Sequence, residues 1–114
     1  MFNCCEPEAI TISLARIAAD KQLQERLQQS QVLLGAYANR LTVVDPNWTF
    51  AESEAPQPFR DDLDETHYWT DFVRLWTSNL GVKLVGGCCG MTPEHIAYIH
   101  SRREQGRHED SNKH

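Results

Sequence analysis

The stretch that most constrains the fold is 85–96, where two adjacent cysteines stand between a short apolar run and the start of a helix. Residues 82–85 are mostly apolar and include β-branched side chains, which indicates a buried strand. A Thr-Pro pair follows, which is typical of a helix N-cap and a first helical residue. Three glycines flank Cys88 and Cys89, so the backbone can turn sharply and another group can approach closely. A strand-to-helix turn of this kind is typical of a functional site.

The two cysteines predict a metal site. Neighbouring residues on a regular strand point to opposite faces, so Cys88 and Cys89 reach one point only where the backbone leaves the strand. Two converging thiolates suit a soft, tetrahedral ion, zinc first. Cys4 stands in a similar setting, between a short apolar lead-in and a proline. Since the ends of parallel strands face the same side of a sheet, these distant cysteines can meet in space.

The same residues resemble a known family. Asn3-Cys4, followed much later by Gly-Gly-Cys-Cys-Gly and Thr-Pro-Glu-His-Ile, is similar to the C-terminal part of the homocysteine S-methyltransferase family over nearly the whole chain. Proteins of that family are (β/α)8 barrels in which three cysteines hold a zinc ion. The resemblance implies that Cys4, Cys88 and Cys89 are the zinc ligands and that Cys5 is a non-ligand neighbour.

The resemblance also implies an activity: transfer of a methyl group from an onium-type donor to the thiol of homocysteine, giving methionine. The donor would be S-methylmethionine, S-adenosylmethionine or betaine, and Asn3 and Gly87 would contribute to substrate binding. Three thiolates on Zn²⁺ leave the metal electron-rich, so a bound thiol loses its proton yet stays nucleophilic. We therefore expect no catalytic residue beyond the metal site.

Length limits how much of such a barrel is present. The chain has 114 residues, whereas a complete barrel needs about 250. We expect an α/β fold in which residues 1–103 form the C-terminal third of a (β/α)8 TIM barrel, about three βα units. A missing N-terminal barrel portion would be the partner that completes it. Residues 104–114 are polar throughout and predict a disordered tail.

The order of apolar segments supports this expectation. The pattern predicts alternating strands and helices, hence parallel strands. The expected strands cover 1–4, 32–39 and 82–85, and the expected helices cover Pro7 to about Gln29, Glu65 to about Leu80 and Pro93 to about Arg103. A long connection over 41–64 is either a lid over the site or a surface excursion.

Composition excludes several classes of function. The net charge is −5 and the basic residues are scattered up to the C-terminal tail, which argues against nucleic-acid binding. No apolar run approaches the length of a membrane span, and the N-terminus has no signal-peptide pattern. The cysteines form two vicinal pairs, which fits metal binding in a reducing compartment better than secreted disulfides, so we expect a cytoplasmic location.

Several readings stay open. His95 could be a fourth ligand, although a surface-facing or capping histidine is favoured. Asn39 ends the second strand, but the pattern assigns it no role. Asp61 to Glu65 is better explained as a solvated helix start than as a cation site. The alternative to an enzyme is a truncated, catalytically inactive zinc-binding fragment or interaction module, and a redox dithiol is less favoured because Cys-x-x-Cys spacing is lacking.

Overall fold

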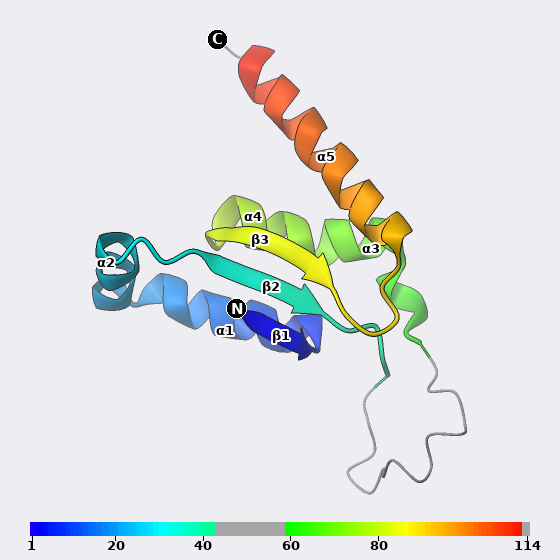
Figure 1. Ribbon diagram of the computed structural model, residues 1–114, viewed down its shortest axis with the longest axis horizontal. Coiled ribbons are helices and arrows are strands. Elements are labelled where there is room, and N and C mark those ends of the chain that lie inside the picture. The colour runs from blue at the N-terminus through cyan, green and yellow to red at the C-terminus, as the bar shows by residue number, and fades with distance from the viewer. Residues whose placement is uncertain (43–58, 113–114) are drawn as a thin grey trace, which may run out of the picture.

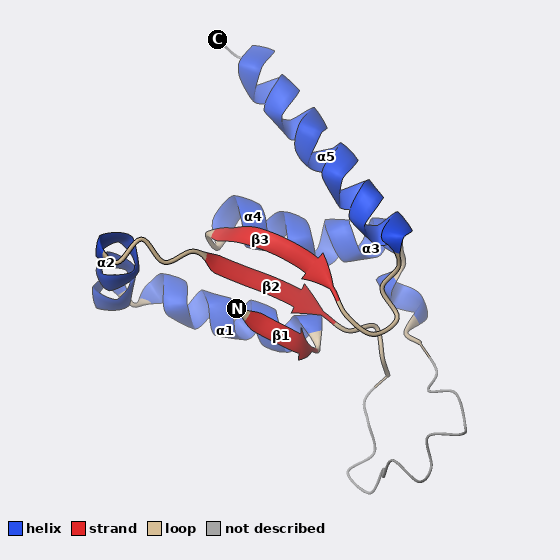
Figure 2. Cartoon of the chain, in the orientation of Figure 1, coloured by secondary structure: helices blue, strands red, loops and turns tan. Residues whose placement is uncertain are grey.

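The computed structural model describes residues 1–42 and 59–112 and contains one parallel three-stranded sheet. The strands are β1 (Phe2–Cys5), β2 (Leu34–Ala38) and β3 (Val82–Gly87), in the spatial order β1-β2-β3. Each strand is followed by helical structure, and α1, α3 and α4 lie behind the sheet in Figures 1 and 2. The expected α/β class with parallel strands is confirmed.

The first helical region is divided in two. The helical pattern predicted a single helix from Pro7 to about Gln29, and this is wrong: α1 covers Pro7–Ala19 and α2 covers Lys21–Gln29. Between them Asp20 is extended, with φ −95° and ψ 98°, and its carboxylate accepts a hydrogen bond from the Leu23 amide at 3.1 Å. A short acidic side chain that caps the next turn competes with helix continuation, and this explains the break.

The second helical region is continuous from Glu65 to Asn79: α3 (Glu65–Tyr68), the π-helical turn η3 (Trp69–Val73) and α4 (Arg74–Asn79) follow one another directly. A short 3-10 turn, η2 (Asp61–Leu63), precedes it and is separated from α3 by Asp64, whose backbone is extended. The helix expected from Glu65 to about Leu80 is therefore confirmed, whereas the π-helical turn has no signature in the apolar spacing. A π turn adds one residue to the helical repeat and rotates the side chains that follow it.

The last helix is longer than expected. α5 covers Pro93–Asn112, although the sequence predicted an end near Arg103 and a disordered tail over 104–114. After Pro93 this stretch contains no further proline, and it has several Glu and Arg residues, which favour the helix. The helix therefore continues past the last core contact, and Figure 1 shows its C-terminal half extending away from the sheet.

The core lies between the sheet and the helices. Ten hydrophobic residues are buried there: Ile10, Leu14, Ala36, Ala38, Leu63, Tyr68, Val73, Trp76, Val82 and Ile99. The Trp76 indole N–H donates to the Thr11 hydroxyl at 2.8 Å, which ties α4 to α1 across this core. The helices expected from Pro7 and from Glu65 do contribute buried residues to this core, whereas α2, in the second half of the first expected helix, has none.

The opposite face of the sheet carries apolar side chains that are exposed. A Cβ added at Gly35 would meet Met1 at 2.6 Å and Leu84 at 3.2 Å, so these side chains share that face. Leu84 is 48% exposed and Met1 is 71% exposed. Among the described residues, no helix covers this side of the sheet (Figure 2).

The expected long connection, 41–64, falls largely outside the described residues, which omit 43–58. Its two described ends meet through an isolated antiparallel bridge between Leu41 and Phe59. The amide of Arg60 also donates to the carbonyl of Arg40 at 2.8 Å.

None of the helices in the described ranges has both the length and the apolar character needed to cross a bilayer.

Trp76 offers a test of this core. Replacing Trp76 with Ala removes a fully buried indole and its hydrogen bond to Thr11, and we expect the free energy of unfolding to fall by about 3–5 kcal/mol. The control is Arg74→Ala, an exposed position on the same helix, which should leave stability near the parent value. Urea unfolding followed by fluorescence or circular dichroism measures both, and equal effects of the two changes would contradict the described packing.

Candidate metal centre

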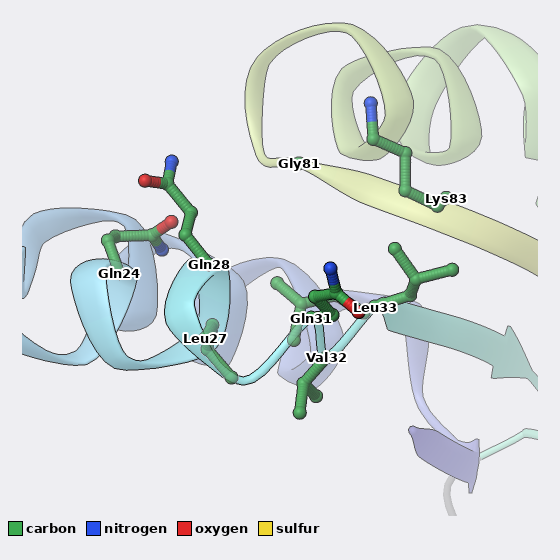
Figure 3. Close-up of a pocket in the computed structure, with 9 residues that line it drawn as sticks. Gln24, Leu27, Gln28, Gln31, Val32, Leu33, Gly81 and Lys83 are labelled. Atoms are coloured by element: carbon green, nitrogen blue, oxygen red, sulfur yellow. The ribbon is translucent and has the colours of Figure 1, made fainter.

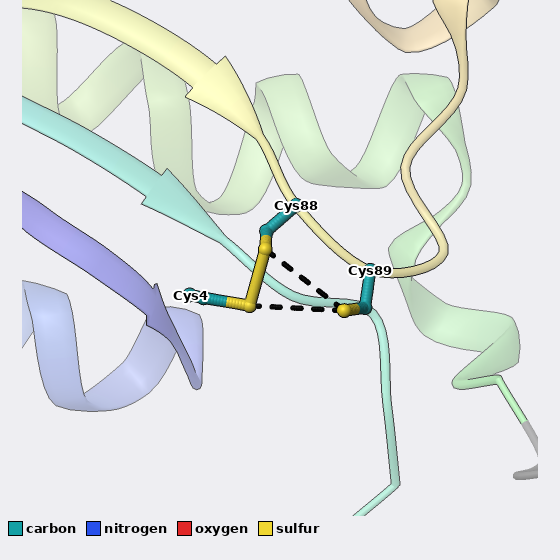
Figure 4. A group of neighbouring side chains, drawn as sticks. All are labelled: Cys4, Cys88 and Cys89. Carbon is teal, nitrogen blue, oxygen red and sulfur yellow. Dashed lines mark hydrogen bonds between the residues drawn. A yellow bond between two sulfur atoms is a disulfide. The ribbon is translucent and has the colours of Figure 1, made fainter.

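Three cysteine sulfur atoms converge at one end of the sheet (Figure 4). The Sγ atoms of Cys4, Cys88 and Cys89 all lie within 4.8 Å of one another. Cys4 and Cys88 form a disulfide with a Cα–Cα distance of 5.4 Å, and the Cys89 Sγ is 3.9 Å from each of the other two sulfur atoms. The residues predicted to be ligands are thus brought together, with two of the sulfur atoms covalently joined.

Parallel strands explain this convergence. Cys4 lies near the carboxyl end of β1 and Cys88 directly follows β3, on either side of the end of β2. Asn3 pairs with Tyr37 and Cys5 pairs with Ala38, so Cys4 is an extra residue in the ladder, a β-bulge. Its φ is +49°, which is left-handed and uncommon for a non-glycine residue. Bulges re-aim side chains next to functional sites, and this one lets Cys4 meet Cys88.

When the cysteines are reduced, their sulfur atoms fit the geometry of a zinc site. With Zn–S bonds of about 2.3 Å, tetrahedral ligands lie about 3.8 Å apart. The 3.9 Å separations from Cys89 to Cys4 and to Cys88 already match that value. The Cys4–Cys88 bond would have to be reduced, after which these two sulfur atoms need to separate to the same distance. Cys89 is exposed, so one side of the cluster is open to a fourth ligand from solvent.

Cys5 differs from its neighbour. Its side chain packs against the buried core, and burial raises the pKa of its thiol. A thiol that packs against apolar groups and resists deprotonation is a poor metal ligand. Within the described residues, the cluster with metal-binding geometry contains Cys4 but not Cys5.

The end of β2 holds both cysteine turns. The Cys88 amide donates to the Ala38 carbonyl at 2.9 Å, and the Arg40 amide donates to the Cys89 carbonyl at 2.7 Å. On the other side, the Asn39 amide donates to the Cys5 carbonyl at 3.1 Å. Three consecutive residues therefore connect the two halves of the cluster.

The turn after Cys89 needs glycine. Gly90 has φ +82°, and a Cβ there would lie 2.8 Å from the Arg40 Cβ and 3.0 Å from the Phe59 ring. Such distances are too short for ordinary carbon contacts, so only glycine, which has no Cβ, fits at this position. Phe59 is 52% exposed and thus places an aromatic ring at the edge of the cluster turn.

A hollow of about 440 Å³ lies beside Gly87, the residue before Cys88. Its lining consists of Gly87, Met91, Thr92, Pro93 and Ile96. Gly87, predicted as a substrate-binding residue, lines this hollow with its backbone. A Cβ at this position would meet Met91 at 2.5 Å, so the Met91 side chain packs closely over Gly87. Asn3, the other predicted substrate residue, is exposed on β1.

His95 is not part of the sulfur cluster. It is 1% exposed, so the surface-facing reading is wrong, whereas the capping reading is confirmed. Its Nδ1 accepts from the Thr92 amide at 3.1 Å, just before the first residue of α5. Nε2 must then carry the proton, which it donates to the Leu63 carbonyl at 2.9 Å. His95 thus joins the turn after the cysteines to η2.

Tyr68 is a site-supporting residue that sequence reasoning missed. Its hydroxyl accepts from the Ala38 amide at 3.3 Å and donates to the Gly86 carbonyl at 3.0 Å, near the ends of β2 and β3. Burial raises the pKa of Tyr68 to about 12, so the hydroxyl keeps its proton and can donate. The sequence pattern assigned no role to Tyr68, and the π turn after it had no signal in the sequence.

An ion pair fixes the segment beside the cluster. The Arg60 guanidinium makes two hydrogen bonds to the Glu8 carboxylate, at 2.9 and 2.5 Å, and also contacts Asp62. These bonds lower the pKa of Glu8 below its usual value. The pair joins the first turn of α1 to η2. The acidic segment agrees with the expected solvated helix start: Asp62 is exposed although it contacts Arg60, and Asp64 caps α3 by accepting from the His67 amide at 2.8 Å.

A second hollow lies at the other end of the sheet (Figure 3). It has a volume of about 460 Å³, between the C-terminal part of α2 and the first residues of β2 and β3. Its lining includes Leu27, Val32, Leu33 and Lys83, together with glutamine side chains. The two hollows are thus separated by the length of the strands, and the one beside Gly87 lies at the same end of the sheet as the cysteines.

Parallel strands with three converging cysteines at their carboxyl ends define an α/β protein with a cysteine cluster that is capable of binding metal once its disulfide is reduced. The family model for homocysteine S-methyltransferase matches residues 1–103, and the chain belongs to this methyltransferase family. The resemblance drawn from the two cysteine motifs is thereby confirmed. No curated protein matches the chain significantly, and no solved structure does.

The Glu8–Arg60 pair predicts a pH dependence of stability. Because the pKa of Glu8 is lowered in the folded state, the pair stabilises the fold above the ordinary value of 4.5, and this is lost as pH falls through the lower, folded value. We expect Glu8→Gln to cost up to about 1 kcal/mol at neutral pH, since Glu8 is half exposed, and to cost nothing in acid.

The matched control is Glu25→Gln, an exposed glutamate on α2. Urea unfolding of the parent and both variants, at neutral pH and well below pH 4.5, provides the measurement. A loss of stability in Glu8→Gln that persists unchanged in acid would show that the ion pair is not its source.

Proposed function

We propose that the reduced chain binds one zinc ion through Cys4, Cys88 and Cys89. The observation that carries this proposal is the 3.9 Å spacing of the Cys89 sulfur from both other sulfur atoms, which matches zinc–thiolate geometry. The pKa of Cys5 is raised by burial, which supports its role as a non-ligand. Thiolate ligation requires a reducing compartment, and the cytoplasm meets that condition.

We further propose that this centre serves methyl transfer to the thiol of homocysteine, giving methionine. When bound, zinc would lower the pKa of an incoming thiol while three thiolates keep that thiol nucleophilic. The cysteines supply the negative charge that favours approach of a cationic methyl donor such as S-methylmethionine, S-adenosylmethionine or betaine. The exposure of Cys89 leaves room for the incoming thiol. Family membership supports the reaction class.

Substrate contacts are proposed from the same edge of the sheet. The hollow lined by Gly87 and Met91 includes the residue before Cys88 in its lining, and we propose that it receives the carbon chain of a ligand whose sulfur lies at the cluster. Asn3 is exposed one residue before Cys4 and can offer its amide to a polar end of the substrate. These two residues are the proposed substrate contacts of this chain.

The fold proposal is that the described sheet is the C-terminal third of a (β/α)8 barrel. Three parallel strands with helices on one face only have the arrangement of barrel units, in which the other face lines the interior. Leu84 and Met1 on that other face support this proposal because they are 48% and 71% exposed. The remaining strands would come from an N-terminal barrel portion acting as partner.

The same exposed face favours a second candidate function, a zinc-binding module without methyl transfer. The cluster lies at the edge of a sheet whose far face is uncovered among the described residues, so substrate groups that an opposite wall would provide are lacking there. This candidate keeps the metal ligands and omits the chemistry. It differs from the first in one measurable property, the formation of methionine.

Zinc content tests the metal site directly. The full chain is reduced with a phosphine under anaerobic conditions, supplied with zinc and desalted, and metal per chain is measured by elemental analysis. We expect about one zinc in the parent and in Cys5→Ser, and a near-complete loss in Cys88→Ser and Cys89→Ser. Equal zinc content in Cys5→Ser and Cys88→Ser would refute the ligand assignment.

Methyl transfer is measured with donors that carry a deuterated methyl group. The zinc-loaded chain is incubated with homocysteine and each of the three donors, with and without the N-terminal barrel portion of a family member. Labelled methionine from the parent, absent with Cys88→Ser, supports the enzyme. A chain that binds zinc but forms no labelled methionine in any combination supports the module.

A further inference from the structure

We infer that Asn39 is a positioning residue for Cys4: its side-chain amide holds the bulged backbone that aims the Cys4 sulfur at Cys88 and Cys89. This inference rests on the proposed zinc site and extends it to a residue that does not touch the metal. The Asn39 Nδ2 atom donates to the Cys4 carbonyl at 3.0 Å. No sulfur atom takes part in this contact.

The orientation of the Asn39 amide is defined by its partners. Its Oδ1 accepts from the Leu41 amide at 3.2 Å, and a backbone N–H can only donate. Nδ2 is therefore the group that faces the Cys4 carbonyl. The Asn39 main-chain amide donates to the next carbonyl along, that of Cys5, at 3.1 Å. One residue thus binds two consecutive carbonyls of the bulge.

The Cys4 carbonyl depends on such a donor. Cys4 is the extra residue between the paired positions Asn3 and Cys5, and an extra residue in a bulge has no partner in the ladder. Its φ of +49° is unfavourable for a side chain that is not glycine. A left-handed residue persists only where its surroundings hold it, and the Asn39 amide supplies that restraint.

The direction of the Cys4 side chain follows from this backbone state. If Cys4 relaxed to an ordinary extended conformation, the bulge would be lost and its side chain would turn away from Cys88. The main-chain bonds of Ala38 and Arg40 hold Cys88 and Cys89 irrespective of side chain. Of these three residues, Asn39 is thus the one whose side chain can be substituted to test how Cys4 is positioned.

Two variants isolate the contact. Asn39→Ala removes both side-chain bonds. Asn39→Asp keeps the shape and the acceptor for the Leu41 amide, but it cannot donate to the Cys4 carbonyl, so it remains informative if the alanine variant folds poorly. An added carboxylate would itself attract Zn²⁺, so weaker binding in this variant is not explained by charge. The control is Asn79→Ala, at an exposed asparagine that ends α4.

The first readout is metal binding by the reduced full chain. We expect both Asn39 variants to bind zinc about 10- to 100-fold more weakly than the parent in competition with a chromophoric chelator, and Asn79→Ala to bind like the parent. With saturating Co²⁺, the thiolate charge-transfer absorption per metal should also fall in the Asn39 variants, since fewer thiolates reach the ion. A merely structural role would lower stability without changing the spectrum of the folded complex.

The second readout needs no metal. The chain is equilibrated with glutathione, free thiols are alkylated, and the fraction of Cys4–Cys88 disulfide is measured by mass spectrometry. Both Asn39 variants should show a smaller fraction than the parent, because Cys4 is no longer aimed at Cys88. If both readouts match the parent in both variants, the inference is overturned and the zinc proposal stands. If the parent binds no metal while the disulfide fraction still falls, the zinc proposal fails and the positioning role stands.

Discussion

The rest of the structure depends on β2 lying between two parallel neighbours. Because β1 and β3 both pair with it, the two cysteine turns end at the same level and only one strand apart. Cysteines 84 residues apart in the chain thereby come within 5.4 Å at their Cα atoms. Burial of Ala36 and Ala38 against the helices fixes β2, so the core and the cluster share one element. In the reduced chain, loosening the core at β2 would separate the sulfur atoms.

Polar groups around the cluster form hydrogen bonds within the protein in the absence of a ligand. Tyr68 joins the ends of β2 and β3, and His95 joins the start of α5 to η2. Among the described residues, no buried side-chain nitrogen or oxygen lacks a hydrogen-bond partner. A buried network that is fully satisfied is rigid, whereas a partly satisfied one shifts. The frame of the centre is therefore organised in advance, and the exposed Cys89 is its accessible corner.

Motifs with strong local signals were predictable from the sequence, and tertiary effects were not. The Gly-Gly-Cys-Cys turn and the helix that begins at Glu65 are each determined by residues that are close together in the sequence. The break at Asp20 was missed because a capping side chain competed with a continuous stripe. The roles of Asn39 and Tyr68 depend on carbonyls that belong to other strands, so no local pattern could reveal them. The length of α5 was underestimated because polar composition was taken as disorder.

The bulge at Cys4 also separates two adjacent thiols into different environments. Cys4 turns toward the cluster, while Cys5 packs against the core with a raised pKa. An electrophile from solvent therefore meets the exposed Cys89 well before it meets Cys5. Cys5 is partly buried by its packing against the core, so its alkylation should be slower than that of Cys89 and should speed up when β1 loosens from the core. The alkylation rate of Cys5 relative to that of Cys89 therefore reports how firmly the first strand packs on the core.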